Sequence, residues 1–187
     1  MLKNNTTTAE KIVYKRAAEW LVRNYSAIKL MDPESIHTFQ SSTNFIQGFV
    51  YRCLRSAAKE TLDLNYNWNR IGVHKYITPI SLERYESSKK TSYIKEHVVC
   101  KNIYFKDIIN ELKKESPDED TIGNRLLKYY FTALITKEED KRLDEKGLRR
   151  VMCVNEEWDY ESLFIRYETA GIELVENPYY VLKKQDR

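Results

Sequence analysis

Apolar residues recur at intervals of three and four positions along two stretches in the first third of the chain. This spacing is typical of amphipathic helices. The first stretch follows Thr7 and Glu10, which stand three residues apart as in a capping box, and it ends before Pro33. The second stretch runs from Phe45 to Ala58. We therefore predict two helices here, with their apolar faces packed on each other or on later parts of the chain.

The rest of the chain alternates between helical spacing and short segments rich in aromatic and β-branched residues, which are typical of strands. Pro79 can open a helix, Thr136 and Glu139 form a second capping box, and Gly147 is a typical residue after a helix end. The predicted helices are 79–85, 104–112, 121–127 with Thr121 as its cap, 136–147 and 160–170. The predicted strands are 93–100, 129–135 and 172–175, with an exposed turn at 87–92 and a frayed end after Pro178.

This order of elements predicts an α+β protein with a single domain over residues 1–187. Residues 1–64 form a helical N-terminal part, and residues 65–187 form an α+β part that holds a small antiparallel sheet. We expect the helical part to pack on that sheet.

Composition supports a folded protein and excludes several other classes. Hydrophobic residues make up 42% of the chain, and 5 Gly and 4 Pro residues leave little room for flexible linkers. The sequence has no apolar run of about 18 residues, as a transmembrane helix needs, and its first residues lack the apolar core of a secretion signal. The 3 cysteines are far apart and odd in number, which argues against a disulfide framework or a zinc ribbon. We expect a cytoplasmic protein without a membrane partner.

The formal net charge is only +3, from 31 basic and 28 acidic side chains. This balance does not by itself indicate a nucleic-acid-binding protein, so any basic surface has to come from local clustering. One such cluster follows the second capping box and could contact a phosphate backbone. Pairing with neighbouring acids such as Asp144 and Glu145 would explain the same charges equally well. The basic residues of this cluster are Lys141, Arg142, Lys146, Arg149 and Arg150.

A group of residues with potential chemistry surrounds His97, one of 3 histidines in the chain. His97 follows Glu96 in a predicted strand. Asp140 and Asp144 stand four residues apart, so they lie on one face of the helix that follows the next strand. Carboxylates are the ligands that Mg²⁺ prefers, and a neutral imidazole beside the ion can accept a proton from an attacking water.

These residues resemble the HNH, or ββα-metal, endonucleases over about residues 92–150. The stretch from Glu96 to Val99 resembles the acidic-His-aliphatic start of the family motif, and residues 134–140 resemble its strand-Thr-helix segment. The resemblance implies a ββα-metal-like core and a metal-dependent phosphodiesterase that acts on DNA with Mg²⁺ or Mn²⁺. It implies His97 as the general base and Glu96, Asp140 and Asp144 at the metal. The chain departs from the pattern at Cys100, where the family has Pro, in lacking a clear middle Asn, and in an insertion of some 30 residues between the strands.

A second hypothesis is a non-catalytic protein that binds a protein partner, such as a phage-type inhibitor of a host defence or nucleic-acid-processing protein. The departures from the HNH pattern favour it, and His97 would then be a buried, hydrogen-bonded residue of the sheet. A homodimer through the tyrosine-rich surface is a related expectation. DNA binding without cleavage is the least favoured hypothesis, because no helix-turn-helix is recognisable. The aromatic residues that suit a protein interface are Tyr66, Trp68, Trp158, Tyr179 and Tyr180.

Overall fold

A computed structural model describes residues 4–29, 43–67, 69–87, 93–154 and 157–184. The predicted end of the first helix before Pro33, residues 88–92 of the predicted turn, and Trp68 lie outside these ranges. The chain divides into two compact units. The sheet unit comprises Met1–Asn5, Trp68–Cys100 and Tyr129–Lys184, and the helical unit comprises Thr6–Asn67, Lys101–Lys128 and Gln185–Arg187.

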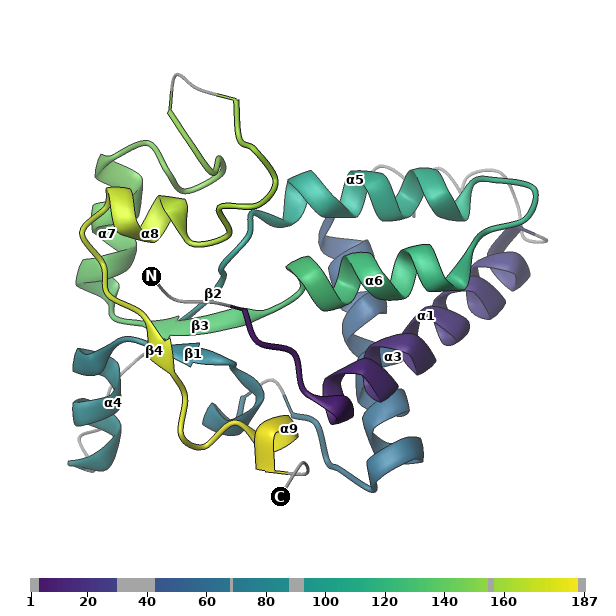
Figure 1. Cartoon of the computed structure of the whole chain (residues 1–187), viewed down its shortest axis with the longest axis horizontal. Coiled ribbons are helices and arrows are strands. Elements are labelled where there is room, and N and C mark those ends of the chain that lie inside the picture. Colours follow the sequence, from purple (N-terminus) through teal and green to yellow (C-terminus); the bar gives the residue numbers. More distant parts are fainter. Residues whose placement is uncertain (1–3, 30–42, 68, 88–92, 155–156, 185–187) are drawn as a thin grey trace. The chain divides into compact units, whose positions relative to one another are not determined.

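The helical unit is built from long amphipathic helices (Figure 1). Both helices predicted in the first third of the chain are confirmed, and α1 and α3 pack along each other through faces of alanine, leucine and valine. Thr7 and Glu10 form the predicted capping box, each backbone N–H donating to the side chain of the other. Close approach at Gly123 brings α6 against Ala18 of α1. The helices of this unit are α1 (Thr8–Lys29), α3 (Thr43–Leu62), α5 (Lys101–Leu112) and α6 (Glu119–Tyr129).

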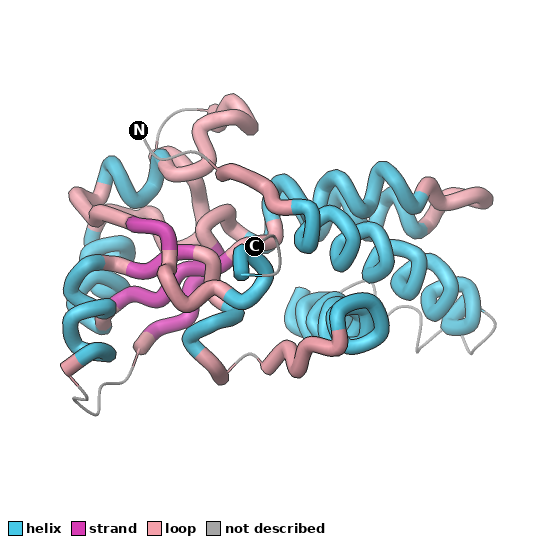
Figure 2. The backbone as a smooth tube through the Cα atoms, turned by 60° about the horizontal axis from the view of Figure 1, so that its bottom comes forward, coloured by secondary structure: helices cyan, strands magenta, loops and turns pink. Residues whose placement is uncertain are grey.

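The sheet unit holds a four-stranded sheet with the order β2-β3-β1-β4 (Figures 1 and 2). The pairs β2–β3 and β1–β4 are antiparallel, whereas β1 and β3 are parallel. The α+β class is therefore confirmed, but the sheet is mixed rather than antiparallel, because the two-residue strand β1 was not predicted. The strands are β1 (Tyr76–Ile77), β2 (Ile94–His97), β3 (Thr132–Ile135) and β4 (Val175–Glu176).

Short helices surround this sheet, and Thr78 and Thr136 cap two of them. The capping box of Thr136 and Glu139 is present as predicted, and Thr78 also donates a hydrogen bond of 2.9 Å to the buried Glu139 carboxylate. The first turn of α7 is thus fixed to the end of β1. These helices are α4 (Pro79–Glu86), α7 (Lys137–Glu145), α8 (Ile165–Thr169) and α9 (Val181–Lys184), with a 3₁₀ turn at Ile71–Val73.

Several predicted boundaries are wrong for local reasons. The helix predicted at 121–127 begins at Glu119, and the Thr121 hydroxyl donates to Asp118 instead of capping it. The helix predicted at 160–170 is reduced to α8, because Tyr160 has a φ of +62° and Asp159 accepts hydrogen bonds from the next turn. Residues after Pro178 include α9 rather than only a frayed end.

An aromatic cluster forms the centre of the sheet unit. Tyr76 meets Phe131 and Phe164 edge-on, with ring centroids 5.5 Å and 5.1 Å apart. Such edge-to-face contacts add to the stabilisation from burying the rings.

Within the part of the chain that the structure describes, no helix is long and apolar enough to cross a membrane.

Candidate functional site

The predicted site residues lie on β2 and α7, which are connected through β3. His97 pairs with Thr132 at the beginning of β3, and Ile94 pairs with Ile135 at its end. Helix α7 begins directly after that end (Figure 1). At about 3.3 Å per residue, the ladder position of His97 and the cap of α7 lie about 13 Å apart along the strand. Strands β2 and β3 are antiparallel and α7 follows β3, as the resemblance implies. The predicted base His97 and the start of α7, however, lie at opposite ends of this strand pair.

Glu96 is bound by a residue that the sequence pattern did not single out. The side chain of Arg166, from α8, is 0% exposed, and its Nη2 forms an ion pair with Glu96 Oε1. The same Nη2 donates to the His97 carbonyl oxygen at 2.9 Å and to the Tyr167 hydroxyl at 3.2 Å. The Glu96 carboxylate therefore neutralises a buried cation, and a metal ion would have to compete with Arg166 for it.

The other terminal nitrogen of Arg166, Nη1, contacts the segment that follows β2 and the segment that follows α7. It donates to the Leu148 carbonyl oxygen at 3.1 Å and to the Arg149 carbonyl oxygen at 3.3 Å, and it lies 3.1 Å from Cys100 Sγ. The guanidinium also stacks over the Tyr167 ring at 5.0 Å from the centroid. Burial lowers the pKa of Arg166, but the neighbouring Tyr167, Glu96 and Cys100 raise it by more, so the residue stays charged.

His97 is a buried residue of the sheet. Its side chain is 7% exposed, and its ring meets the Tyr130 ring edge-on with centroids 5.2 Å apart. This arrangement agrees with the alternative in which His97 is a packed component of the sheet. His74, a second buried histidine, likewise has a structural contact, because its Nδ1 lies 2.8 Å from the Thr132 hydroxyl.

The acidic residues of α7 do not join His97 in a metal site. Asp144 pairs with Arg149 at 3.6 Å, and Asp140 is half-buried on the same helix. Among the described residues, which include all four predicted site residues, no group of three or more His, Cys, Asp or Glu side chains could hold a metal ion. The residues present thus do not fit the Mg²⁺ or Mn²⁺ site implied by the HNH resemblance, and a ββα-metal core is not confirmed.

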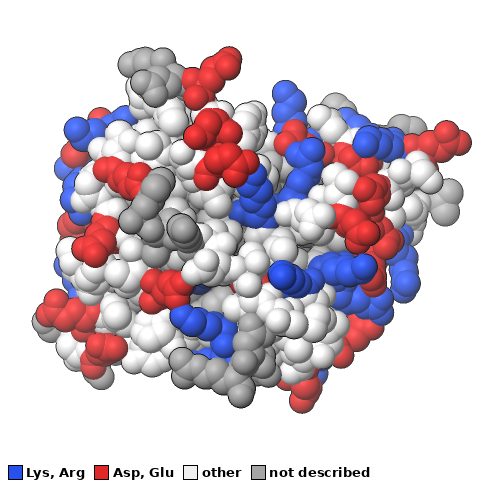
Figure 3. All heavy atoms as spheres, in the orientation of Figure 1, with Lys and Arg blue, Asp and Glu red and all other residues white. Residues whose placement is uncertain are grey.

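Three of the five predicted nucleic-acid contacts, Lys141, Arg142 and Arg149, have acidic partners within the protein. Lys141 pairs with Glu145 at 3.3 Å, and Arg142 donates to the Gly171 carbonyl oxygen at 3.2 Å besides lying 3.9 Å from Glu139. Lys146 follows the last turn of α7 as its C-terminal cap. Arg149 and Arg150 are exposed. On the face shown in Figure 3, basic side chains are interspersed with acidic ones, as expected for a solvated surface with local ion pairs.

The aromatic residues expected at an interface divide into two groups. Tyr66 and Tyr180 are buried and belong to the cores of their units, whereas Trp158 and Tyr179 are half-buried.

A sequence signal for Arg166 did exist: it is a single charge inside the apolar run from Leu163 to Tyr167. That signal does not by itself indicate burial, because the charge could equally lie on the outer face of a helix.

Comparisons with models of protein families, with curated proteins and with solved structures give no match for this chain.

Proposed function

We propose that this protein is a non-catalytic binding protein that acts through a protein partner. The observation that carries this proposal is the ion pair between Glu96 and the fully buried Arg166. Removal of the Glu96 carboxylate would leave the charge of Arg166 buried without compensation, so the fold requires this carboxylate. Its role beside His97 is therefore structural, and the acidic-His pair does not require a catalytic explanation.

The expected partner is a host defence protein or a nucleic-acid-processing protein, which the chain would inhibit by binding. Two observations support binding over hydrolysis. His97 is packed against Tyr130, and the carboxylates of α7 do not share a metal-binding group with it. On α7, Lys141 pairs with Glu145, and Asp144 pairs with Arg149 from the segment after the helix, which leaves less of the basic cluster for a phosphate backbone.

The first test measures whether a divalent cation stabilises the protein. A ligand present at 100 times its dissociation constant stabilises the native state by about 2.7 kcal/mol. We expect no rise in melting temperature when Mg²⁺ or Mn²⁺ replaces EDTA. The Asp140→Asn and Asp144→Asn variants should then behave like the wild type in both buffers. A rise in the wild type that either variant abolishes would contradict the proposal.

The second test measures cleavage directly. We expect purified protein with Mg²⁺ or Mn²⁺ to leave plasmid and single-stranded DNA intact. Cleavage by the wild type that is lost in His97→Gln, with an unchanged melting temperature, would favour the endonuclease hypothesis instead. His97→Gln is preferred over His97→Ala because it keeps more of the volume that packs against Tyr130.

A further inference from the structure

The outer edge of the sheet unit offers unpaired backbone groups. Strand β4 is last in the strand order and pairs with β1 on one side. The Asn177 N–H donates to the Lys75 carbonyl oxygen at 2.9 Å, so these two residues form a hydrogen-bonded pair, and Val175 with Ile77 forms the next one. The backbone N–H and C=O of Glu176, and by the same alternation those of Leu174, therefore point away from β1. No described residue forms a backbone hydrogen bond with them on that side.

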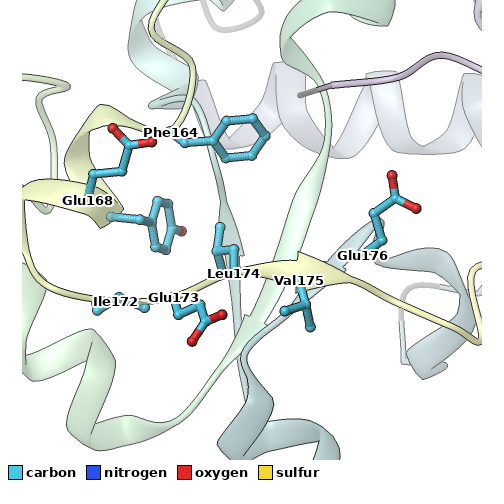
Figure 4. A pocket seen from close by; sticks show the side chains of 8 residues that line it. Phe164, Glu168, Ile172, Glu173, Leu174, Val175 and Glu176 are labelled. Carbon is cyan, nitrogen blue, oxygen red and sulfur yellow. The ribbon is translucent and has the colours of Figure 1, made fainter. Parts of the chain in front are cut away.

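A groove of about 510 Å³ lies beside this edge (Figure 4). Phe164, Tyr167 and Leu174 contribute its apolar lining. Figure 4 shows Leu174 and Glu176 pointing to one side of the extended segment and Glu173 and Val175 to the other. A strand added at this edge would therefore lie beside one apolar and one acidic side chain on each face of the sheet.

The segment that forms this edge is strongly acidic. Residues 157–176 contain six acidic side chains and one basic one, which gives a formal charge of −5 in a chain whose net charge is +3. The basic residue is Arg166, which is buried and paired with Glu96. Around the groove, Glu168 and Glu173 are exposed, and Glu176 pairs with Lys183. The charge at the edge therefore favours a cationic partner.

We propose that the β4 edge binds an extended basic segment of the partner protein, which adds a fifth strand to the sheet. This inference rests on the proposed function and specifies its partner. Backbone hydrogen bonds to Leu174 and Glu176 provide affinity, and the side chains directly opposite provide specificity. Basic residues fit opposite the exposed Glu173 and opposite Glu176, where they would share the carboxylate with Lys183, and apolar residues fit opposite Leu174 and Val175. The expected motif is basic-apolar-apolar-basic.

Charge argues against a second copy of the chain at this edge. If two β4 edges paired in antiparallel fashion about Leu174 and Val175, each Glu173 would lie opposite Glu176 of the other copy. Like charges directly opposite each other destabilise a strand pair. A partner of opposite charge avoids this repulsion.

The test uses the full chain and fluorescein-labelled peptides of about seven residues, which is the length of an ordinary strand. One peptide carries Arg-Val-Val-Arg at its centre, and a matched control carries Val-Arg-Arg-Val with the same composition and charge. We expect fluorescence anisotropy to show binding of the first peptide and about two- to thirtyfold weaker binding of the control, since each of the two opposed charge pairs contributes about 0.2–1 kcal/mol. Equal binding of the two peptides, or binding of neither, would overturn the proposal.

A protein variant separates local recognition from general charge attraction. Glu173→Lys should weaken binding of the first peptide by about five- to tenfold, because it replaces an attraction with a repulsion. Glu83→Lys makes the same charge change at an exposed position of α4 in the same unit, and should leave binding unchanged. An equal loss in both variants would mean that net charge, and not the β4 edge, attracts the peptide.

Amide hydrogen exchange tests strand addition itself. Bound peptide should slow exchange at Leu174 and Glu176, whereas Val175, already bonded to β1, should change little. Unchanged exchange at Leu174 and Glu176 despite peptide binding would contradict the added strand. These readouts involve neither metal nor DNA, so the edge proposal can fail while the absence of cleavage still supports a non-catalytic protein, and the reverse outcome is equally recognisable.

Discussion

The two units bury polar side chains in different ways. In the helical unit, the buried polar residues Glu10 and Glu111 lie at or near helix ends, where they accept hydrogen bonds from backbone N–H groups. In the sheet unit, buried polar residues lie throughout the core and connect strands to helices, as Arg166, Glu139 and His74 do. The helical unit thus depends on apolar packing, and the sheet unit depends on a network in which each polar group needs a specific partner.

This difference predicts where single substitutions have large effects. A network of buried polar groups is destabilised strongly when one member is removed, because the others remain buried without partners. Exposed ion pairs on helices contribute little, because water and salt screen them. Substitutions at matched positions in the two units should therefore differ in their cost.

The largest difference between the units is expected when the arginine of an arginine-carboxylate pair is replaced in each of them. Arg166→Met should lower the free energy of unfolding by about 3–5 kcal/mol, since three carbonyl oxygens lose their donor and the Glu96 carboxylate, which is 24% exposed, loses its partner. Arg125→Met, which breaks the partly exposed pair with Asp107 in the helical unit, should cost less than about 1 kcal/mol. Amide hydrogen exchange resolves the two units separately. Similar losses in both variants would contradict the comparison.

Glycine positions provide the next comparison. A Cβ on Gly72 would lie 2.9 Å from both the Tyr179 carbonyl oxygen and Val181 Cγ1, so Gly72→Ala should destabilise the sheet unit by about 1–3 kcal/mol. A Cβ on Gly123 would lie 3.6 Å from Ala18 Cβ, an ordinary contact. Gly123→Ala should therefore stabilise α6 by up to about 1 kcal/mol, because alanine is the better helix former. Urea denaturation checks both values, and a destabilised Gly123→Ala would show that the α1–α6 contact leaves no room for a methyl group.

The two capping boxes have the same Thr-x-x-Glu arrangement, but they differ in burial and in the extra hydrogen bond that Glu139 accepts from Thr78. Thr136 is 1% exposed and shares Glu139 with Thr78, whereas Thr7 is half-buried. Removal of a cap costs about 0.5–2 kcal/mol, with larger values where the freed groups stay buried. We expect about 2 kcal/mol for Thr136→Ala and about 1 kcal/mol for Thr7→Ala by thermal unfolding. The reverse order would indicate that burial does not govern these caps.

The sequence predicts the helical unit better than the sheet unit, because apolar packing leaves a local pattern in the sequence and a network of specific polar partners does not. The stripes of α1 and α3 and the capping box of Thr7 and Glu10 are encoded within a few neighbouring residues, and these predictions are confirmed. The capping box of Thr136 and Glu139 is the corresponding local signal of the sheet unit, and it is confirmed too. The packing of α5 and α6 with α1 and α3 is not encoded locally. It joins residues 101–128 to the first third of the chain, across the boundary at residue 64 that the order of predicted elements indicated.

The candidate site depends on contacts that no local pattern contains. Arg166 and Glu96 are 70 positions apart, and the sequence shows only a charged residue in an apolar run. The acidic-His pair was visible, but whether Glu96 faces a metal, water or an arginine depends on how the chain returns after α7. Strand β1 escaped prediction because two residues cannot display a period of two. Its parallel pairing with β3 is in turn what fixes the first turn of α7 through Thr78 and Glu139.

The smallest predicted effect concerns two buried thiols. Burial raises the pKa of Cys53 in the helical unit from its ordinary value near 9.0 to about 12, although Arg52 lowers it in part. Burial also raises the pKa of Cys100 in the sheet unit, but there Arg166 opposes the rise. The unfolded chain therefore loses the thiol proton at a lower pH than the native protein does, and stability falls as the pH rises above about 9.

For Cys53 this loss amounts to about 1 kcal/mol between pH 8 and pH 10. We expect Cys53→Ala to flatten the alkaline decrease in the free energy of unfolding, as measured by urea denaturation at each pH. Cys100→Ala should flatten it less, because Arg166 partly stabilises the thiolate in the native state. An equal change in both variants would mean that the guanidinium does not reach the Cys100 sulfur, and would weaken the network on which the sheet unit depends.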